Sequence, residues 1–120
     1  MAAFYEDLII WQKAMDIAEK VYALTKTLPA DEIYGLSSQM RRSAVSIPSN
    51  IAEGHARSGS HKEFKHFLTI AKGSLAELET QIILCIRVDL VSEKNVSDLL
   101  TMMHALRRML CVFISKLSNT

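Results

Sequence analysis

The sequence predicts an all-α protein, an up-down-up-down four-helix bundle in which residues 1–120 form a single domain. Three observations lead to this prediction. Hydrophobic residues make up 49% of the chain, the level of an ordinary globular protein. Along four successive stretches they recur at the three- and four-residue spacing of amphipathic helices. The chain has only 2 prolines and 4 glycines, too few for the many turns of an all-β fold.

The first helix is expected to run from about Asp7 to Leu28, with a wide apolar face. One stripe of this face contains Ile10, Ala14, Ile17, Val21, Leu24 and Leu28. A second stripe beside it contains Leu8, Trp11, Met15, Ala18 and Tyr22. Pro29 disfavours helical backbone at the residue before it, so the helix is expected to end there. Asp31 is expected to cap the helix that follows.

The second helix is expected from about Glu32 to Arg57. Its buried positions are predicted to be Ile33, Leu36, Met40, Ala44, Ile47 and Ile51. Four further apolar residues widen this face, namely Tyr34, Val45, Pro48 and Ala52. The face is therefore wider than one neighbouring helix covers. Pro48 removes one backbone hydrogen bond inside the helix and is expected to bend its axis.

The third and fourth helices begin at recognisable caps. Gly54 and residues 57–60 are expected to form the preceding turn, and Ser60 followed by Glu63 is typical of a capping box. The third helix should extend to about Val88, with Phe64, Phe67, Leu68, Ala71, Leu75, Leu78, Ile82 and Cys85 inward. Ser92 should cap the fourth helix, which ends near Leu117. Its inward residues are predicted to be Val96, Leu99, Leu100, Met103, Leu106, Leu110, Phe113, Ile114 and Leu117.

Charge and cysteine content favour some classes of protein over others. Lys and Arg together number 14 and Asp and Glu 13, so no global field attracts nucleic acid or anionic lipid. We interpret Cys85 and Cys111 as buried thiols in a reducing compartment. The N-terminal residues lack the pattern of a signal peptide, and no apolar run approaches the ~18 residues of a membrane span. A cytoplasmic location without membrane contact is expected.

No catalytic or metal centre is expected. Glu63 and His66 have the Glu-x-x-His spacing of carboxylate-bridged di-iron bundles, but such a site requires a second copy and two further inward carboxylates. Glu63 is already explained as part of a capping box. The sequence also contains no glycine-rich phosphate loop and no nucleophile elbow. We therefore expect no metal, no cofactor and no enzymatic activity.

A line of polar residues is predicted where the second and third helices meet. If these helices form an antiparallel hairpin that turns near Gly59, the numbers of facing residues sum to about 118. This register predicts an ion pair between Arg42 and Glu77. We name the set the polar seam, with members Gln39, Arg42, Ser46, Asn50, Glu53, Ser74, Glu77 and Gln81. The favoured interpretation is a structural seam that sets helix register, and the alternative is a ligand groove.

Two runs in this hairpin resemble a known family. Residues 39–54 and 73–81 are similar to the bacterial four-helix-bundle proteins encoded in intervening sequences of large-subunit rRNA genes. Residues 4–14 also resemble the start of that family, so the resemblance covers nearly the whole chain. The motif residues carried over are Gln39, Arg41, Arg42, Ser46, Asn50, Glu53, Gly54, Ser74, Glu77 and Gln81, none with a catalytic role.

The resemblance implies a four-helix protomer that assembles into a ring-shaped homopentamer without known enzymatic activity. A similar fold serves as the accessory protein of diversity-generating retroelements, which binds reverse transcriptase and nucleic acid. The excess apolar surface of the first two helices independently predicts a homo-oligomer. The leading hypothesis is a non-enzymatic oligomeric interaction protein associated with RNA or a ribonucleoprotein. The alternative is a small-molecule-binding bundle that uses the polar seam.

The residues expected to contact RNA are basic and lie in two places. Arg57, Lys62 and Lys65 surround the predicted turn between the second and third helices, and Arg107 and Arg108 lie on the fourth helix. Each protomer offers a modest basic patch, but a ring displays several copies at fixed separation. Weak phosphate contacts then act together.

Overall fold

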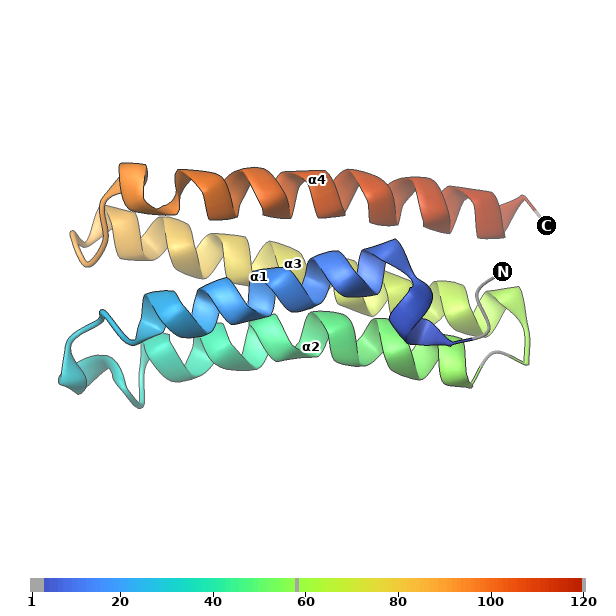
Figure 1. The fold of residues 1–120 in the computed structure, drawn as a ribbon, viewed down its shortest axis with the longest axis horizontal. Coiled ribbons are helices and arrows are strands. Elements are labelled where there is room, and N and C mark those ends of the chain that lie inside the picture. Colours follow the sequence, from blue (N-terminus) through green and yellow to red (C-terminus); the bar gives the residue numbers. More distant parts are fainter. Residues whose placement is uncertain (1–3, 58, 120) are drawn as a thin grey trace.

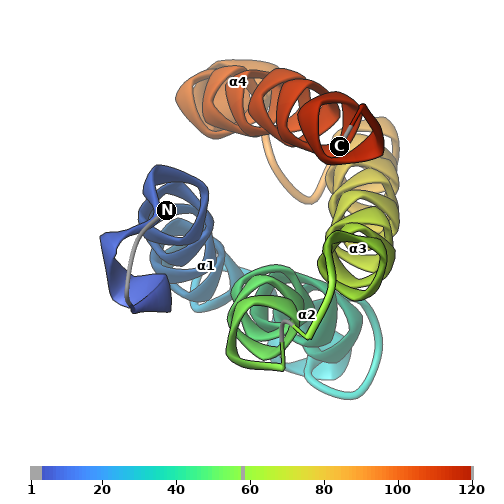
Figure 2. The ribbon, with the colours of Figure 1, turned by 90° about the vertical axis from the view of Figure 1, so that its right-hand side faces the viewer.

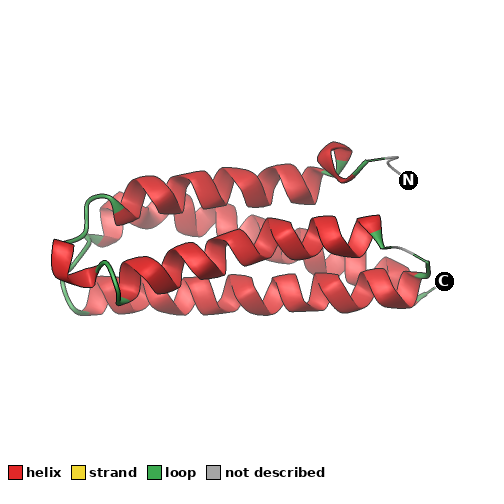
Figure 3. Cartoon of the chain, turned by 90° about the horizontal axis from the view of Figure 1, so that it is seen from below, coloured by secondary structure: helices red, strands yellow, loops and turns green. Residues whose placement is uncertain are grey.

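The computed structural model describes residues 4–57 and 59–119. Within these residues the chain forms a bundle of four long helices and contains no strand, which confirms the predicted all-α four-helix fold (Figures 1 and 3). Consecutive helices run in opposite directions along a bundle of 46 × 22 × 20 Å (Figure 1). In order, the elements are η1 (Tyr5–Asp7), α1 (Ile9–Thr25), η2 (Ala30–Glu32), α2 (Leu36–Ala56), α3 (His61–Arg87) and α4 (Glu93–Ser118). No helix of the described part is both long and apolar enough to cross a membrane.

The starts of α3 and α4 follow the predicted caps. The Ser60 hydroxyl accepts a hydrogen bond from the backbone N–H of Glu63 at 3.2 Å, and the Ser92 hydroxyl accepts one from Asn95 at the same distance. Each serine satisfies one of the first four N–H groups of its helix, which have no acceptor within the helix. Both predicted helix starts are confirmed.

The predicted start of α2 is wrong. The helix begins at Leu36, after the short η2 helix, and Asp31 makes no side-chain cap. Instead, the Glu32 carboxylate accepts a hydrogen bond from the Leu36 N–H at 3.2 Å. Ile33 and Tyr34 therefore lie before the helix. Ile33, which was predicted to be buried, is 56% exposed, and Tyr34 is 96% exposed. α1 also begins later than predicted, because Tyr5–Asp7 forms a separate 3-10 turn.

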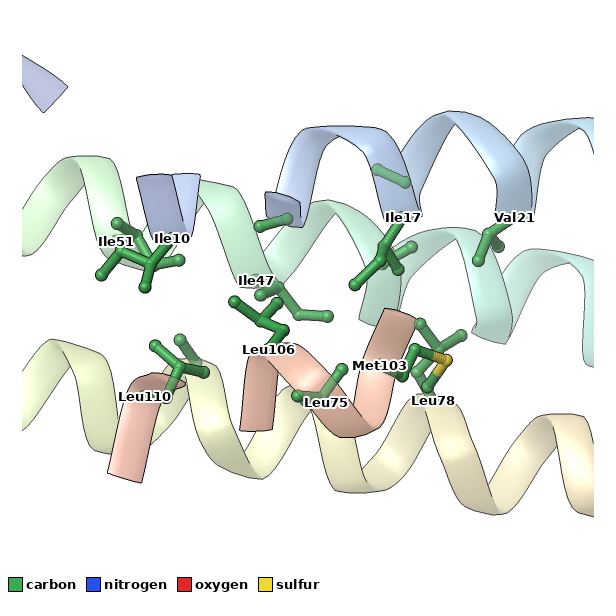
Figure 4. Packing of buried hydrophobic residues seen from close by; sticks show 14 of the residues in the cluster. Ile10, Ile17, Val21, Ile47, Ile51, Leu75, Leu78, Met103, Leu106 and Leu110 are labelled. Atoms are coloured by element: carbon green, nitrogen blue, oxygen red, sulfur yellow. The ribbon is translucent and has the colours of Figure 1, made fainter. Parts of the chain in front are cut away.

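The core fills the space between all four helices. Most of the residues predicted to point inward are buried, and Figure 4 shows Ile17, Ile47, Leu78 and Leu106, one from each helix, pointing into this space. Others of the inward set are only half-buried, including Leu24, Leu36, Phe67, Leu100, Phe113 and Ile114. Each fully buried aliphatic side chain contributes about 1.5–3 kcal/mol through removal of apolar surface from water.

The two thiols lie in different environments. Cys85 is fully buried, as predicted, with its Sγ 3.6 Å from the Met40 sulfur. Cys111 is exposed on α4, so its predicted burial is wrong. Both cysteines are free.

α2 and α3 form the most extensive helix pair, and Gly54 explains part of their close approach. Gly54 is buried inside α2 and does not belong to the turn, contrary to the prediction. A Cβ atom on Gly54 would lie 2.6 Å from the Phe67 Cβ, which is too close for any side chain. Of the predicted turn residues, Ser58 lies outside the described part of the chain.

Candidate functional site

The polar seam brings four of its predicted members together between α2 and α3. The Ser46 and Ser74 hydroxyls are hydrogen-bonded at 2.8 Å across the helix pair. The Asn50 amide donates to the Ser46 hydroxyl at 3.0 Å and to the Ser46 carbonyl at 2.8 Å. One turn away, Glu77 Oε1 accepts a hydrogen bond from Ser43 at 2.7 Å. These pairs lie close to the register expected from an antiparallel hairpin.

The predicted ion pair between Arg42 and Glu77 is wrong. Arg42 is exposed and forms no salt bridge within the described residues. Ser43, the next residue, is 2% exposed, and its hydroxyl donates a hydrogen bond to the Glu77 carboxylate instead. Adjacent helix positions differ by about 100° in direction, so a small rotation of α2 decides which of the two faces α3. Ser43 lies on the same flank of α2 as Ser46 and Asn50, and this helical spacing is the sequence feature that could have identified it as the partner of Glu77.

The remaining seam members do not join this network. Gln39 is exposed, and Glu53 pairs with Arg57 at 3.0 Å along α2. Gln81 is half-buried, and its Oε1 is buried without a hydrogen-bond partner among the described residues. Because most of the central polar groups satisfy one another, the geometry supports the structural interpretation, in which the seam fixes the register of α2 and α3.

Arg41 connects α1 to α2. Its Nε donates to the Thr25 hydroxyl at 2.7 Å, and its guanidinium lies 4.6 Å from the centroid of the Tyr22 ring. A cation over an aromatic face is stabilised by the ring quadrupole, by about 0.5–2 kcal/mol depending on exposure. Arg41 therefore has a positioning role on the opposite side of α2 from the seam.

An apolar groove of about 600 Å³ lies on the outside of the bundle between α1 and α2, and we name it the α1–α2 groove. Its apolar lining combines the second stripe predicted for the first helix with the flank predicted for the second. It is lined by Tyr5, Trp11, Met15, Ala18, Glu19, Tyr22, Ala23, Lys26, Val45, Pro48, Ser49 and Ala52. Most of the excess apolar surface predicted from the sequence thus gathers in one place, whereas Leu8 lines a different groove and Tyr34 lies elsewhere.

A second groove, of about 950 Å³, lies between the start of α1 and the last third of α4, and we name it the α1–α4 groove. Figure 2 shows these two helices flanking that side of the bundle, at the end where both termini lie. Its lining is Asp7, Leu8, Ile9, Ile10, Arg108, Met109, Val112, Phe113 and Lys116. Ile9 and Val112 are 59% and 54% exposed. This surface was not predicted from the sequence, although Met109 and Val112 widen the apolar face of α4.

The basic residues expected to contact RNA are not equally available. Arg57 pairs with Glu53 at 3.0 Å and approaches Glu63 at 3.8 Å. Arg107 lies 3.5 Å from Glu79, which also binds His104 at 2.7 Å. Lys62, Lys65 and Arg108 form no salt bridge with any residue that the structure describes. The structure therefore divides the predicted set into two paired arginines and three cations without acidic partners.

The Glu63 and His66 pair is engaged in other contacts. Glu63 takes part in the start of α3 and lies near Arg57, and His66 packs edge-on against Phe67 at 5.3 Å. Among the described residues, no group of three or more His, Cys, Asp or Glu side chains is placed to hold a metal ion.

Together these features define a class of protein, a helical bundle with a hydrogen-bonded polar seam and apolar surface beyond its core. The chain belongs to the 23S rRNA-intervening sequence protein family, whose sequence profile matches residues 6–112. This result confirms the family resemblance found in the sequence.

A solved structure supports the same assignment. The chain is similar to a protein with unknown function from the S23 ribosomal protein family of Bacteroides thetaiotaomicron VPI-5482, with a TM-score of 0.80 and 25% sequence identity. The alignment covers 88% of this chain and 98% of that one. A comparison with curated protein sequences gives no significant match.

Proposed function

We propose that the protein is a non-enzymatic, self-associating interaction protein whose assembled form binds RNA or a ribonucleoprotein. The observation that carries the proposal is the pair of apolar grooves outside a core that is already filled. A monomer would leave both grooves in water, and large exposed apolar patches are typical of interaction sites.

The arrangement of the two grooves favours a ring. The α1–α2 groove and the α1–α4 groove lie on the two sides of α1 that face different neighbouring helices. If the first groove of one protomer contacts the second groove of the next, the contact is heterologous, and heterologous contacts close into rings when the rotation permits. We propose such a head-to-tail ring, a pentamer as the family resemblance implies.

The mass of the particle in solution tests self-association. We expect light scattering after size-exclusion chromatography to give about five times the 13.5 kDa of one chain. Val45→Glu places a charge in the α1–α2 groove and should release monomers. Tyr34→Glu is the matched control, because Tyr34 is 96% exposed and lies outside both grooves. A wild-type monomer at micromolar concentration would contradict the proposal.

RNA binding is proposed through Lys62 and Lys65, which lack acidic partners among the described residues. Arg108 also lacks one, but it lines the α1–α4 groove that the proposed ring covers. One chain carries a formal net charge of only +1, so a single protomer should bind weakly. In a ring the same cations recur at fixed separation, and weak phosphate contacts then reinforce one another.

A titration with structured RNA at two salt concentrations tests this part. Binding should weaken as salt rises, and the double variant Lys62→Glu, Lys65→Glu should weaken it further while the oligomer stays intact. Lys94→Glu is the control, because Lys94 is exposed near the start of α4, at the other end of the bundle (Figure 1). No binding at low salt, or equal losses in both variants, would remove RNA as the partner of this surface.

The alternative, a small-molecule site in the polar seam, is favoured by one observation. The buried Gln81 Oε1 has no hydrogen-bond partner within the described residues, and a ligand donor would satisfy it. Native mass spectrometry of the purified protein tests this alternative. A bound compound that Gln81→Leu removes would support it, and a spectrum of protein alone would contradict it.

A further inference from the structure

Both apolar grooves have charged residues in their walls. The α1–α2 groove contains Glu19 and Lys26, and the α1–α4 groove contains Asp7, Arg108 and Lys116. All five of these residues are exposed, and none forms a salt bridge with any residue that the structure describes. Their charges are therefore free to interact with a partner that covers the grooves.

The charges of the α1–α4 groove oppose one way of covering it. In a two-fold contact the same surface of each copy meets itself. Arg108 and Lys116 against Asp7 give each copy of this groove a net charge of +1, so +1 would face +1. Like charges that face one another across an interface are unfavourable. A two-fold contact through this groove would therefore bury its apolar surface only against electrostatic repulsion.

The α1–α2 groove provides an acid for this excess positive charge. Glu19 lies in its wall, on an exposed position of α1. Burial of apolar surface is not directional, whereas opposite charges determine which surfaces meet and in which register. A head-to-tail contact, in which the α1–α2 groove of one copy covers the α1–α4 groove of the next, satisfies both requirements. The charges thus favour the heterologous contact over the two-fold one.

The positions of the residues along the bundle indicate which cation Glu19 meets. α1 begins and α4 ends at the same end of the bundle, where both termini lie (Figure 1). Glu19 is in the second half of α1, away from that end. Arg108 lies eight residues, about 12 Å, farther from that end than Lys116 does. Copies that join side by side around an axis along the bundle keep each residue at its own height, so Arg108 is the closer match for Glu19.

The other charged residues of the grooves do not compete with this pair. Lys116 and Asp7 lie together at the end of the bundle that holds the termini, where their opposite charges offset one another. Lys26 follows the last residue of α1 and lies at the opposite end, away from Arg108. Glu19 and Arg108 are therefore the acid and the cation closest in height.

We propose that Glu19 forms a salt bridge with Arg108 of the partner subunit and so determines that the contact is head-to-tail. This inference rests on the self-association proposed above and adds the residues that give the contact its direction. Charged pairs at the edge of an apolar interface contribute to specificity more than to affinity. The apolar walls of the two grooves supply the affinity, and the salt bridge selects the partner surface.

Charge reversal tests the pair. Glu19→Arg and Arg108→Glu should each raise the dissociation constant of the assembly about 10-fold or more, because like charges then face one another. The double variant Glu19→Arg, Arg108→Glu restores opposite charges, so its dissociation constant should return to within about 3-fold of the wild-type value. Asp98→Arg is the control and should have no effect, because Asp98 is exposed on α4 and lies outside both grooves. Sedimentation equilibrium measures each dissociation constant.

Salt distinguishes repulsion from a folding defect in the single variants. At 1 M salt, charges are screened beyond about 3 Å, so both single variants should assemble nearly as well as the wild type. Helix content by circular dichroism should not change, because neither side chain has a salt-bridge partner within the described protomer.

The outcomes separate this pair from the self-association on which it rests. If the wild type assembles and both reversals behave like Asp98→Arg, or if the double variant is no better than the single variants, the salt bridge is overturned while self-association stands. A wild-type monomer would overturn both.

Discussion

The α2–α3 side of the bundle is closely packed, whereas the α1–α4 side is loosely packed. α2 and α3 approach closely at Gly54, and their polar residues are paired across the interface by defined hydrogen bonds. α1 and α4 form the least extensive helix pair and leave Ile9 and Val112 exposed along an apolar groove. We therefore call the closely packed, hydrogen-bonded α2–α3 side the closed side, and the α1–α4 side with its apolar groove the open side.

This difference indicates what each side contributes. Directional hydrogen bonds and a close backbone approach favour one register over others, so the α2–α3 side is suited to fix how these two helices pack. An open apolar surface adds little to that choice, and its burial requires a partner. The same chain thus carries one helix pair that is closely packed and hydrogen-bonded and, beside it, apolar surface suited to association.

The largest effect on stability is expected when a side chain is added at Gly54, where α2 and α3 lie closest together. Gly54→Ala should lower the free energy of unfolding by about 1–3 kcal/mol, because the new methyl group overpacks against Phe67. Gly73→Ala in α3 is the control. No atom lies within 4 Å of its would-be Cβ, so better helix propensity should raise stability by about 0.5–1 kcal/mol. Urea denaturation measures both, and a neutral Gly54→Ala would show that the helices are not in close contact there.

The polar seam should give a smaller and non-additive effect. Ser46→Ala and Ser74→Ala should each cost about 0.5–1.5 kcal/mol, and the double variant should cost less than the sum. The physical reason is that the first substitution already breaks the shared hydrogen bond. A double-mutant cycle by urea denaturation measures the coupling. Additive costs would mean that the two hydroxyls act independently and that the seam does not fix register.

The two cysteines should differ in reactivity. Burial, with a smaller effect from the Glu32 carboxylate, raises the pKa of the Cys85 thiol above 9.0, and its neutral form is inert. In native protein at pH 8 a thiol reagent such as DTNB should therefore label exposed Cys111 and leave Cys85 until the chain unfolds. Two rapidly labelled thiols would contradict burial of Cys85 on the closed side.

The same shift fixes the sign of a pH effect on stability. Because the folded-state pKa of Cys85 is raised, the folded chain holds the thiol proton more tightly than the unfolded chain does. The stabilisation that the protonated Cys85 thiol gives the folded state is fully present below the ordinary thiol pKa of 9.0. It is lost as pH rises through the raised pKa. The free energy of unfolding of wild-type protein should fall over this alkaline range more steeply than that of Cys85→Ala.

Hydrophobic periodicity and capping residues were enough to predict the helices and the approximate pairing of α2 with α3. Ser60 and Ser92 were found because a serine cap acts on residues only a few positions away. The start of α2 was missed because Glu32 reaches forward to Leu36 from a separate short helix, an arrangement that a linear pattern does not contain. Ile33 and Tyr34 were consequently assigned to the wrong surface.

The candidate site was harder to predict than the fold. Whether Arg42 or Ser43 faces Glu77 depends on the rotation of α2 and on the crossing angle, which packing sets and periodicity leaves open.

The central claim is that the two grooves meet head to tail, and a mixing experiment tests it most directly. Val45→Glu blocks the α1–α2 groove and Val112→Glu blocks the α1–α4 groove, at side chains that are 43% and 54% exposed. By light scattering each variant alone should have the 13.5 kDa mass of one chain, because neither has both surfaces. Their equimolar mixture should give a species of twice that mass, since one intact groove of each kind remains. Assembly of either variant alone, or a mixture that stays monomeric, would contradict the head-to-tail account.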